Sequence, residues 1–437
     1  SIMLFFLTFG CVYYNTFYNA EVSFDKANKI IEQSPLLDKG DIPPQAKKLL
    51  GEAINNAKIV LDKYSDSKYV DDAYFLISKA SFLRGEIANS EKYLNLLIKE
   101  YPTSKFFNEA NVWLAYTQFR LGLSDSSIAM LKKINLNTKL TDFESFLIHN
   151  INAEIALDNN QINLALEEYE LAAKLALTKS SKTSIFLKLV SIAEKNQKLE
   201  QVVDYLYKLS IYAPDQISKN AKLDWIKYNR KLGNYKSTIT EIENLLGLAD
   251  YKSIYIKLEL EQAKIYLDQK DFRTAKLLLS QLTENYQRKN ESAEAFYLLG
   301  YIALMEDFDL KLAEDYFDNS KKDKSSSEYG KKSKEMKKII LDFNSLLNDY
   351  DYSLKKFDKK QIIPEEISEI DSLGSNLKDN KRINFDHEIN SKNDLDEKSD
   401  QSNKAIPLND KVSSPDSLLF TIAEKLLYDF NKKDIAI

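Results

Sequence analysis

The chain has very few of the side chains that most catalytic and metal sites need. Its 437 residues include one cysteine, Cys11, and two histidines, His149 and His387. One cysteine cannot form an intrachain disulfide, and a zinc site of cysteine and histidine is excluded. With only 10 glycines, a Gly-rich phosphate loop of the Walker or Rossmann type cannot be assembled. We therefore expect no cofactor and no metal.

Turn-forming residues and basic patches are also scarce. The chain has 8 prolines and 10 glycines, too few for the many turns of a β-sandwich or barrel. Its net charge is -5, and no basic stripe is visible, so the electrostatic signature of a nucleic-acid-binding protein is missing. Composition thus favours an all-α protein without a nucleic-acid partner.

The residues left for catalysis do not form a constellation. His149 lies within a predicted helix and His387 in a polar segment, and a lone helical histidine is more often structural than catalytic. Carboxylate pairs such as Glu167-Glu168 lie where solvated charge is expected. A glycosidase-type pair is opposed only by the lack of a pocket-forming fold. We expect no catalytic residue and no enzyme.

A small residue recurs along the chain in steps of 37, 38, 37, 36, 37 and 38. A large apolar residue follows it by four, and a second contact position precedes it by twelve, displaced by one residue in the last copy. The small residues are Ser90, Ser127, Ala165, Val202, Thr238, Ala275 and Ala313; the apolar ones are Leu94, Leu131, Tyr169, Leu206, Ile242, Leu279 and Phe317; the preceding ones are Ser78, Ala115, Ala153, Val190, Ile226, Ala263 and Gly300.

Such a period is typical of a solenoid of helical hairpins. In the segment Ala73 to Pro102, two amphipathic helices are predicted to join at Gly85 and to end at Pro102. We predict seven such repeats over residues 73–320.

The repeats resemble the tetratricopeptide repeat family. Leu299-Gly300 reproduces the family's Leu-Gly pair, Ala313 and Phe317 its second-helix signature, and Pro102 its helix-ending proline. The period of about 37 exceeds the family's 34, which implies longer turns. The resemblance implies a right-handed solenoid whose first helices line a concave groove that binds proteins or peptides.

The N-terminal residues explain the lone cysteine. An apolar run ends in Leu7-Thr8-Phe9-Gly10-Cys11, too short to span a bilayer and of the length of a signal-peptide core. It resembles a bacterial lipobox, in which the cysteine is lipidated. We interpret residues 1–11 as a signal remnant whose first residues are missing, with Cys11 as the lipidation site.

Together, the lipobox and the repeats resemble the tetratricopeptide lipoproteins of Gram-negative envelopes, of which the BamD-like subunit of the β-barrel assembly machine is one. Tyr101-Pro102-Thr103-Ser104 is similar to the Tyr-Pro-x-Ser that closes repeats there. In that group Asp after the cysteine retains a protein at the inner membrane, and this chain has Val12. The resemblance implies an outer-membrane, periplasm-facing protein that is lipid-anchored.

Four further segments complete the predicted organisation. Residues 12–72 form an N-terminal helical hairpin, and 331–360 a helix that caps the solenoid. Residues 372–414, poor in apolar residues, are expected to form a disordered linker. Residues 416–437 begin a further repeat with no partner for its apolar face, so we expect more protein to follow.

When the groove positions of the family are aligned with the repeats of this chain, they fall on aromatic and cationic side chains of the first helices. These are Phe75, Lys79, Phe82, Tyr116, Phe119, Arg120, Lys264, Tyr297 and Tyr301. They suit a bound peptide or partner helix. For each one, packing in the core between repeats is the more common alternative.

Three functions remain open. The first is a lipid-anchored envelope scaffold for protein–protein interactions, serving for example outer-membrane protein assembly. The second is a glycan-binding nutrient lipoprotein of the SusD-like kind, which the presence of only 2 tryptophans opposes. The third is the non-catalytic arm of an envelope enzyme whose catalytic domain lies beyond Ile437.

Overall fold

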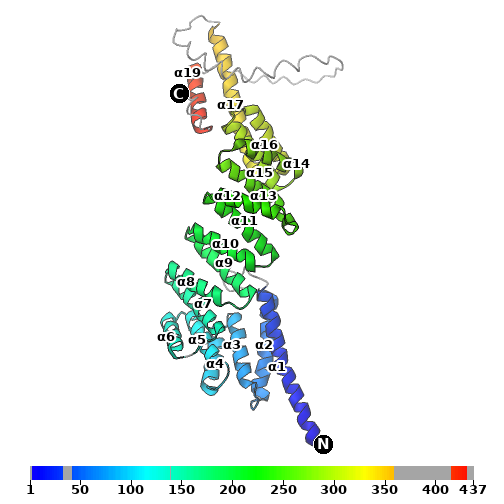
Figure 1. Cartoon of the computed structure of the whole chain (residues 1–437), viewed down its shortest axis with the longest axis vertical. Coiled ribbons are helices and arrows are strands. Elements are labelled where there is room, and N and C mark those ends of the chain that lie inside the picture. The colour runs from blue at the N-terminus through cyan, green and yellow to red at the C-terminus, as the bar shows by residue number, and fades with distance from the viewer. Residues whose placement is uncertain (1, 33–41, 138, 359–414, 431–437) are drawn as a thin grey trace, which may run out of the picture. The chain divides into compact units, whose positions relative to one another are not determined.

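The computed structural model describes residues 2–32, 42–137, 139–358 and 415–430 (Figure 1). Every regular element in these ranges is a helix, which confirms the predicted all-α solenoid of hairpins. The chain divides into two compact units, Ser1–Glu261 and Gln262–Ile437, and the boundary falls inside α13 (Tyr255–Asp268).

Between residues 70 and 324, the described helices pair into seven hairpins. The pairs are α3 (Val70–Leu83) with α4 (Ile87–Glu100), α5 (Phe107–Arg120) with α6 (Ser124–Asn137), α7 (Asp142–Asp158) with α8 (Ile162–Leu175), α9 (Lys179–Lys195) with α10 (Leu199–Tyr212), α11 (Asp215–Lys231) with α12 (Tyr235–Leu246), α13 with α14 (Phe272–Asn285), and α15 (Asn290–Met305) with α16 (Leu310–Lys324). A 3-10 helix, η2 (Ala249–Ile254), precedes α13.

The repeating residue of each second helix is buried together with the apolar residue four positions further on. All seven small positions are at most 1% exposed, and the apolar residues four further on are at most 3% exposed. In the last hairpin, a Cβ added to Gly300 would lie 2.8 Å from the Phe317 ring. Small side chains at these crossings let the helix backbones approach each other, and the large neighbour fills the space beside them.

The turn inside each hairpin repeats with the same register. A residue with positive φ stands five positions before each small residue: Gly85, Gly122, Asn160, Gln197, Gly233, Lys270 and Phe308. In the first turn, the Gly85 amide bonds to the Phe82 carbonyl and the Glu86 amide to the Ser81 carbonyl, both at 2.9 Å. This is the Schellman ending of a helix, which favours glycine at the left-handed residue.

The first unit begins with α1 (Ile2–Glu32) and α2 (Pro44–Lys63), which pack together and against α3. Ala20, Ala27 and Ala53 are buried in this packing, and the Phe17 ring stacks on Tyr69 at 5.3 Å. The helix α1 begins within residues 1–11, ahead of the hairpin predicted for residues 12–72. The single Gly10 does not break it, because one glycine within an apolar run is tolerated in a helix.

The second unit ends with α17 (Glu328–Asp358) and α19 (Pro415–Tyr428). Ile340 and Phe343 of α17 are buried against the last hairpin. The expectation that α19 has no partner for its apolar face is wrong, because that face packs on α17. The predicted linker 372–414 lies outside the described residues.

Replacing a strained turn residue by glycine should stabilise the second unit. Lys270 has φ +61 and an exposed side chain. The change Lys270→Gly therefore relieves the strain of a left-handed backbone conformation without removing a buried contact. We expect an increase of about 1 kcal/mol in the free energy of unfolding, measured from urea denaturation. The control Lys195→Gly, at a helical position, should destabilise by up to about 1 kcal/mol. Equal losses for both variants would contradict the assigned turn.

Candidate functional site

The predicted groove residues of the first unit divide into buried and accessible side chains. Phe75, Phe82 and Phe119 are 5%, 8% and 9% exposed. Phe75 stacks on Phe106 at 4.5 Å, and Phe82 meets Trp113 edge to face at 5.2 Å. For these three phenylalanines burial favours packing between repeats over contact with a partner.

Lys79 lies in a cage of aromatic rings. Its Nζ is 5.0 Å from the centroid of Phe75, 5.7 Å from Trp113, 5.8 Å from Phe24 and 6.0 Å from Phe143. The rings come from α3, α5, α1 and α7, so the cage gathers four helices of the first unit around one ammonium group. Cation–π attraction to several rings stabilises the charge at this half-buried place.

A carboxylate completes the cage. The Glu109 Oε1 atom lies 3.3 Å from the Lys79 Nζ and accepts a bond from the Trp113 Nε1 at 3.2 Å. The two charged side chains are 23% and 20% exposed. The Lys79 charge is thus neutralised within the chain and is not a free anchor for a partner.

Tyr116 belongs to a second polar cluster, which joins α5, α7 and α9. Its hydroxyl donates to both oxygens of Glu154, at 2.9 and 2.8 Å. The Lys188 Nζ donates to the Glu154 Oε1 at 3.1 Å and lies 5.0 Å from the Tyr169 ring centroid. Burial and then the Glu154 charge raise the pKa of the Tyr116 hydroxyl. Burial lowers the pKa of Lys188, but Glu154 and Tyr169 together outweigh it, and the net shift is upward.

Similar contacts link later first helices within each unit. In the first unit Tyr228 donates to Glu194 at 2.9 Å, and Arg230 pairs with Glu261 at 3.1 Å. Burial and the bond to Glu194 raise the pKa of Tyr228 to about 12. In the second unit Lys264 pairs with Glu294 at 2.6 Å. We call the side of the first helices that carries these contacts the first-helix face.

The remaining predicted groove residues differ in exposure. Tyr297 is half-buried and its ring contacts Phe317 and Tyr329, at 5.6 and 5.2 Å. Tyr301 is 44% exposed. Arg120 is exposed, and its guanidinium carbon lies 5.8 Å from the Phe82 ring centroid. Of the nine groove residues, Arg120 and Tyr301 are therefore the most accessible to a partner.

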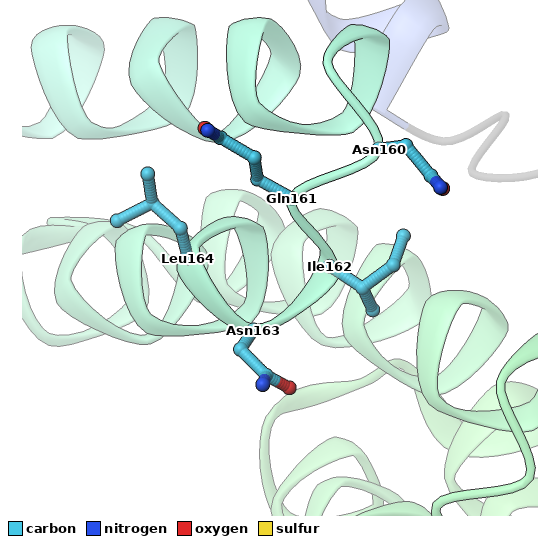
Figure 2. Close-up of a pocket in the computed structure, with 5 residues that line it drawn as sticks. All are labelled: Asn160, Gln161, Ile162, Asn163 and Leu164. Carbon is cyan, nitrogen blue, oxygen red and sulfur yellow. The ribbon is translucent and has the colours of Figure 1, made fainter.

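His149, the one histidine among the described residues, pairs with a carboxylate of the same hairpin. Its Nδ1 lies 2.7 Å from the Glu168 Oε2, across the two helices of one hairpin. A depression is lined by Asn160 and Gln161 of the turn between α7 and α8 and by Ile162, Asn163 and Leu164 at the start of α8, and their side chains point apart rather than converge (Figure 2). None of these five is acidic, basic or nucleophilic. Within the described residues, no cluster of three or more histidine, cysteine or carboxylate side chains is placed to hold a metal.

The carboxylates that organise the first-helix face, chiefly Glu109 and Glu154, were not predicted from the sequence. The sequence does contain one signal for these contacts, which is the spacing of the residues that form them. Residues about one repeat apart lie side by side on neighbouring first helices, and Glu154 stands 38 residues after Tyr116 and 34 before Lys188. Opposite charges or tyrosine–carboxylate pairs at that separation would have predicted the contacts.

Comparison with known proteins supports the type of repeat. Residues 72–104 match the family model of the tetratricopeptide repeat, so the α3–α4 hairpin is a repeat of this kind, and the other hairpins share its register. No curated protein sequence matches the chain.

Solved structures with helical repeats are distantly similar. A tetratricopeptide repeat protein from Parabacteroides merdae is 14% identical, with 62% of this chain and 98% of that chain covered and a TM-score of 0.29. A STAND protein with a tetratricopeptide repeat sensor from Pyrococcus horikoshii is 13% identical, with 63% and 46% covered and a TM-score of 0.31. Human IFIT1 is 11% identical, with 77% and 70% covered and a TM-score of 0.28. These TM-scores are too low to support an argument, so the fold assignment rests on the hairpins of this chain.

Removing the central carboxylate of the Tyr116 cluster should destabilise the first unit. Glu154→Gln removes the charge that pairs with Lys188, and we expect a loss of about 1–3 kcal/mol in unfolding free energy. Asp204→Asn breaks an exposed pair with Lys208, whose side chains are 52% and 40% exposed, and should change stability by under about 1 kcal/mol. Chemical denaturation of both variants checks this, and equal effects would mean that the cluster adds nothing beyond a surface pair.

Proposed function

We propose that this chain is a non-catalytic scaffold that binds other proteins on its first-helix face. The observation that carries the proposal is the tetratricopeptide repeat at residues 72–104 within a run of hairpins of one register. Stacked hairpins present an extended surface, and such surfaces serve protein recognition. Internal pairing of Lys79 and Glu154 in the first unit, and of Lys264 in the second, holds the part of this surface within each unit in one conformation before a partner arrives, which lowers the entropy cost of binding.

In the first unit, Arg120 is the accessible residue of the first-helix face that we propose as a contact for a partner protein. Its guanidinium lies near the Phe82 ring and keeps donors for a partner's carboxylate or backbone carbonyl. Arginine beside aromatic residues is enriched where binding energy concentrates. Tyr301 offers an exposed ring in the second unit. An extended peptide or helix with acidic residues fits this chemistry.

We further propose that the scaffold acts in the bacterial envelope, held at the periplasmic side of the outer membrane by lipid on Cys11, and that its partners are envelope proteins of outer-membrane protein assembly. The lone cysteine after an apolar run supports lipidation. Among the described helices none is long and apolar enough to cross a bilayer. Two or more acyl chains hold a folded body firmly on a membrane.

Loss of the cysteine should release the protein from the membrane. Expressed with its native leader, the wild-type chain should incorporate labelled palmitate and sediment with membranes. Cys11→Ser should lose the label and move to the soluble fraction, because this change removes the acyl attachment. The measurement is metabolic labelling with fractionation, and a Cys11→Ser chain that still sediments would disprove the lipid anchor.

Arg120→Ala should weaken partner capture without loss of stability. We expect envelope proteins captured from solubilised membranes to fall at least about tenfold, or about 1.4 kcal/mol. Lys132→Ala removes the same charge from an exposed position on α6 and should leave capture unchanged. Capture is quantified by mass spectrometry, with thermal melts on the same preparations. Equal capture by both variants would show that Arg120 does not contact the partner. An absence of outer-membrane assembly proteins from the wild-type capture would overturn the proposed role in outer-membrane protein assembly.

A further inference from the structure

The C-terminal helix α19 has the pattern of a ligand for a helix-binding surface. Leu418, Ile422 and Leu426 follow one another at steps of four along one side of α19 and are 9%, 4% and 3% exposed, and Phe430, two residues beyond the end of the helix, is 1% exposed. A stripe with this spacing is typical of an amphipathic helix that lies on an apolar surface. On its other side Phe420 is 66% exposed, so one face of the helix is buried and the other is open.

The surface that receives this stripe belongs to α17 and the last hairpin. Phe430 meets the Phe343 ring edge to face at 4.9 Å and the Phe308 ring at 6.1 Å. Ile422, Leu426 and Phe430 form one core cluster with Ile340 and Phe343 of α17. Figure 1 shows α19 (red) alongside α17 (yellow). Ile340 and Phe343 also pack on the last hairpin, so loss of α19 would uncover only their outer side, including the part of the Phe343 ring that meets Phe430.

The connection between the two helices makes this contact unlike those of the hairpins. In each hairpin the helices are joined by a short turn, whereas residues 359–414, 56 in number, separate α17 from α19. A helix of 14 residues is marginal by itself in water. The helix α19 therefore depends on the α17 surface for its own helical structure, and leaving that surface would unfold α19 without breaking any hairpin.

We propose that the α17 surface around Ile340 and Phe343 is a helix-binding site, which α19 occupies as a displaceable ligand tethered in the same chain. A partner suited to this site presents an amphipathic helix with a large apolar residue at every fourth position. It binds by displacing α19. This regulated site lies in the second unit and is independent of the partner contact proposed at Arg120.

The test uses the full chain and a dye-labelled synthetic peptide of residues 415–430 as the probe. In the wild-type chain α19 occupies the surface, and in Ile422→Asp a charge on the buried stripe releases it. The matched control is Phe420→Asp, which places the same charge on the exposed side of α19. We expect the peptide to bind Ile422→Asp at least tenfold more tightly than wild type, and Phe420→Asp to behave like wild type.

Two further measurements keep the outcome decisive. Circular dichroism of Ile422→Asp should show the hairpins melting as in wild type, and a peptide that itself carries Ile422→Asp should not bind any chain. Equally weak binding of the peptide to all three chains, with the hairpins intact, would overturn the proposal. A wild-type dimer in light scattering that Ile422→Asp converts to a monomer would also overturn it, since α19 would then serve a second copy.

Discussion

The close approach of the two helices of each hairpin, at one buried contact position on each helix, is the constraint on which the rest of the structure depends. Ser90, Ala165, Ala275 and their equivalents are fully buried where the helices cross. At Ala165 or Ala275 a larger side chain would separate the helices and open voids around the large residue four positions further on. The spacing of these crossings sets the period of the chain, and with it the position of every turn and every contact between repeats.

Two features follow from that period. The left-handed turn residue falls five positions before each crossing, even where it is Gln197 or Lys270 instead of glycine, so packing outweighs the local backbone preference. Successive first helices come side by side about one period apart, which brings Glu109 to Lys79 and Glu154 to both Tyr116 and Lys188. The first-helix face is therefore a set of internally paired charges with a few accessible side chains such as Arg120.

Most of the fold was predictable from sequence, because the crossings require small side chains and their neighbours large ones, a pattern visible in a single sequence. The predicted crossings Ser78, Ala153 and Ala263 are all buried. The site was less predictable. A phenylalanine in the groove register can face either a partner or the next repeat, and Phe75 and Phe119 face the repeat. The packing of α19 on α17 escaped prediction because no period links two helices separated by 56 residues.

A double-mutant cycle between Gly300 and Phe317 tests the close approach most directly. An added Cβ at Gly300 would lie 2.8 Å from the ring of the fully buried Phe317. In the wild-type background Gly300→Ala should lower the free energy of unfolding by about 1–3 kcal/mol. In a Phe317→Leu background, where the ring is gone, the same change should cost much less, with a coupling of at least about 0.5 kcal/mol. Equal costs in the two backgrounds would contradict the account.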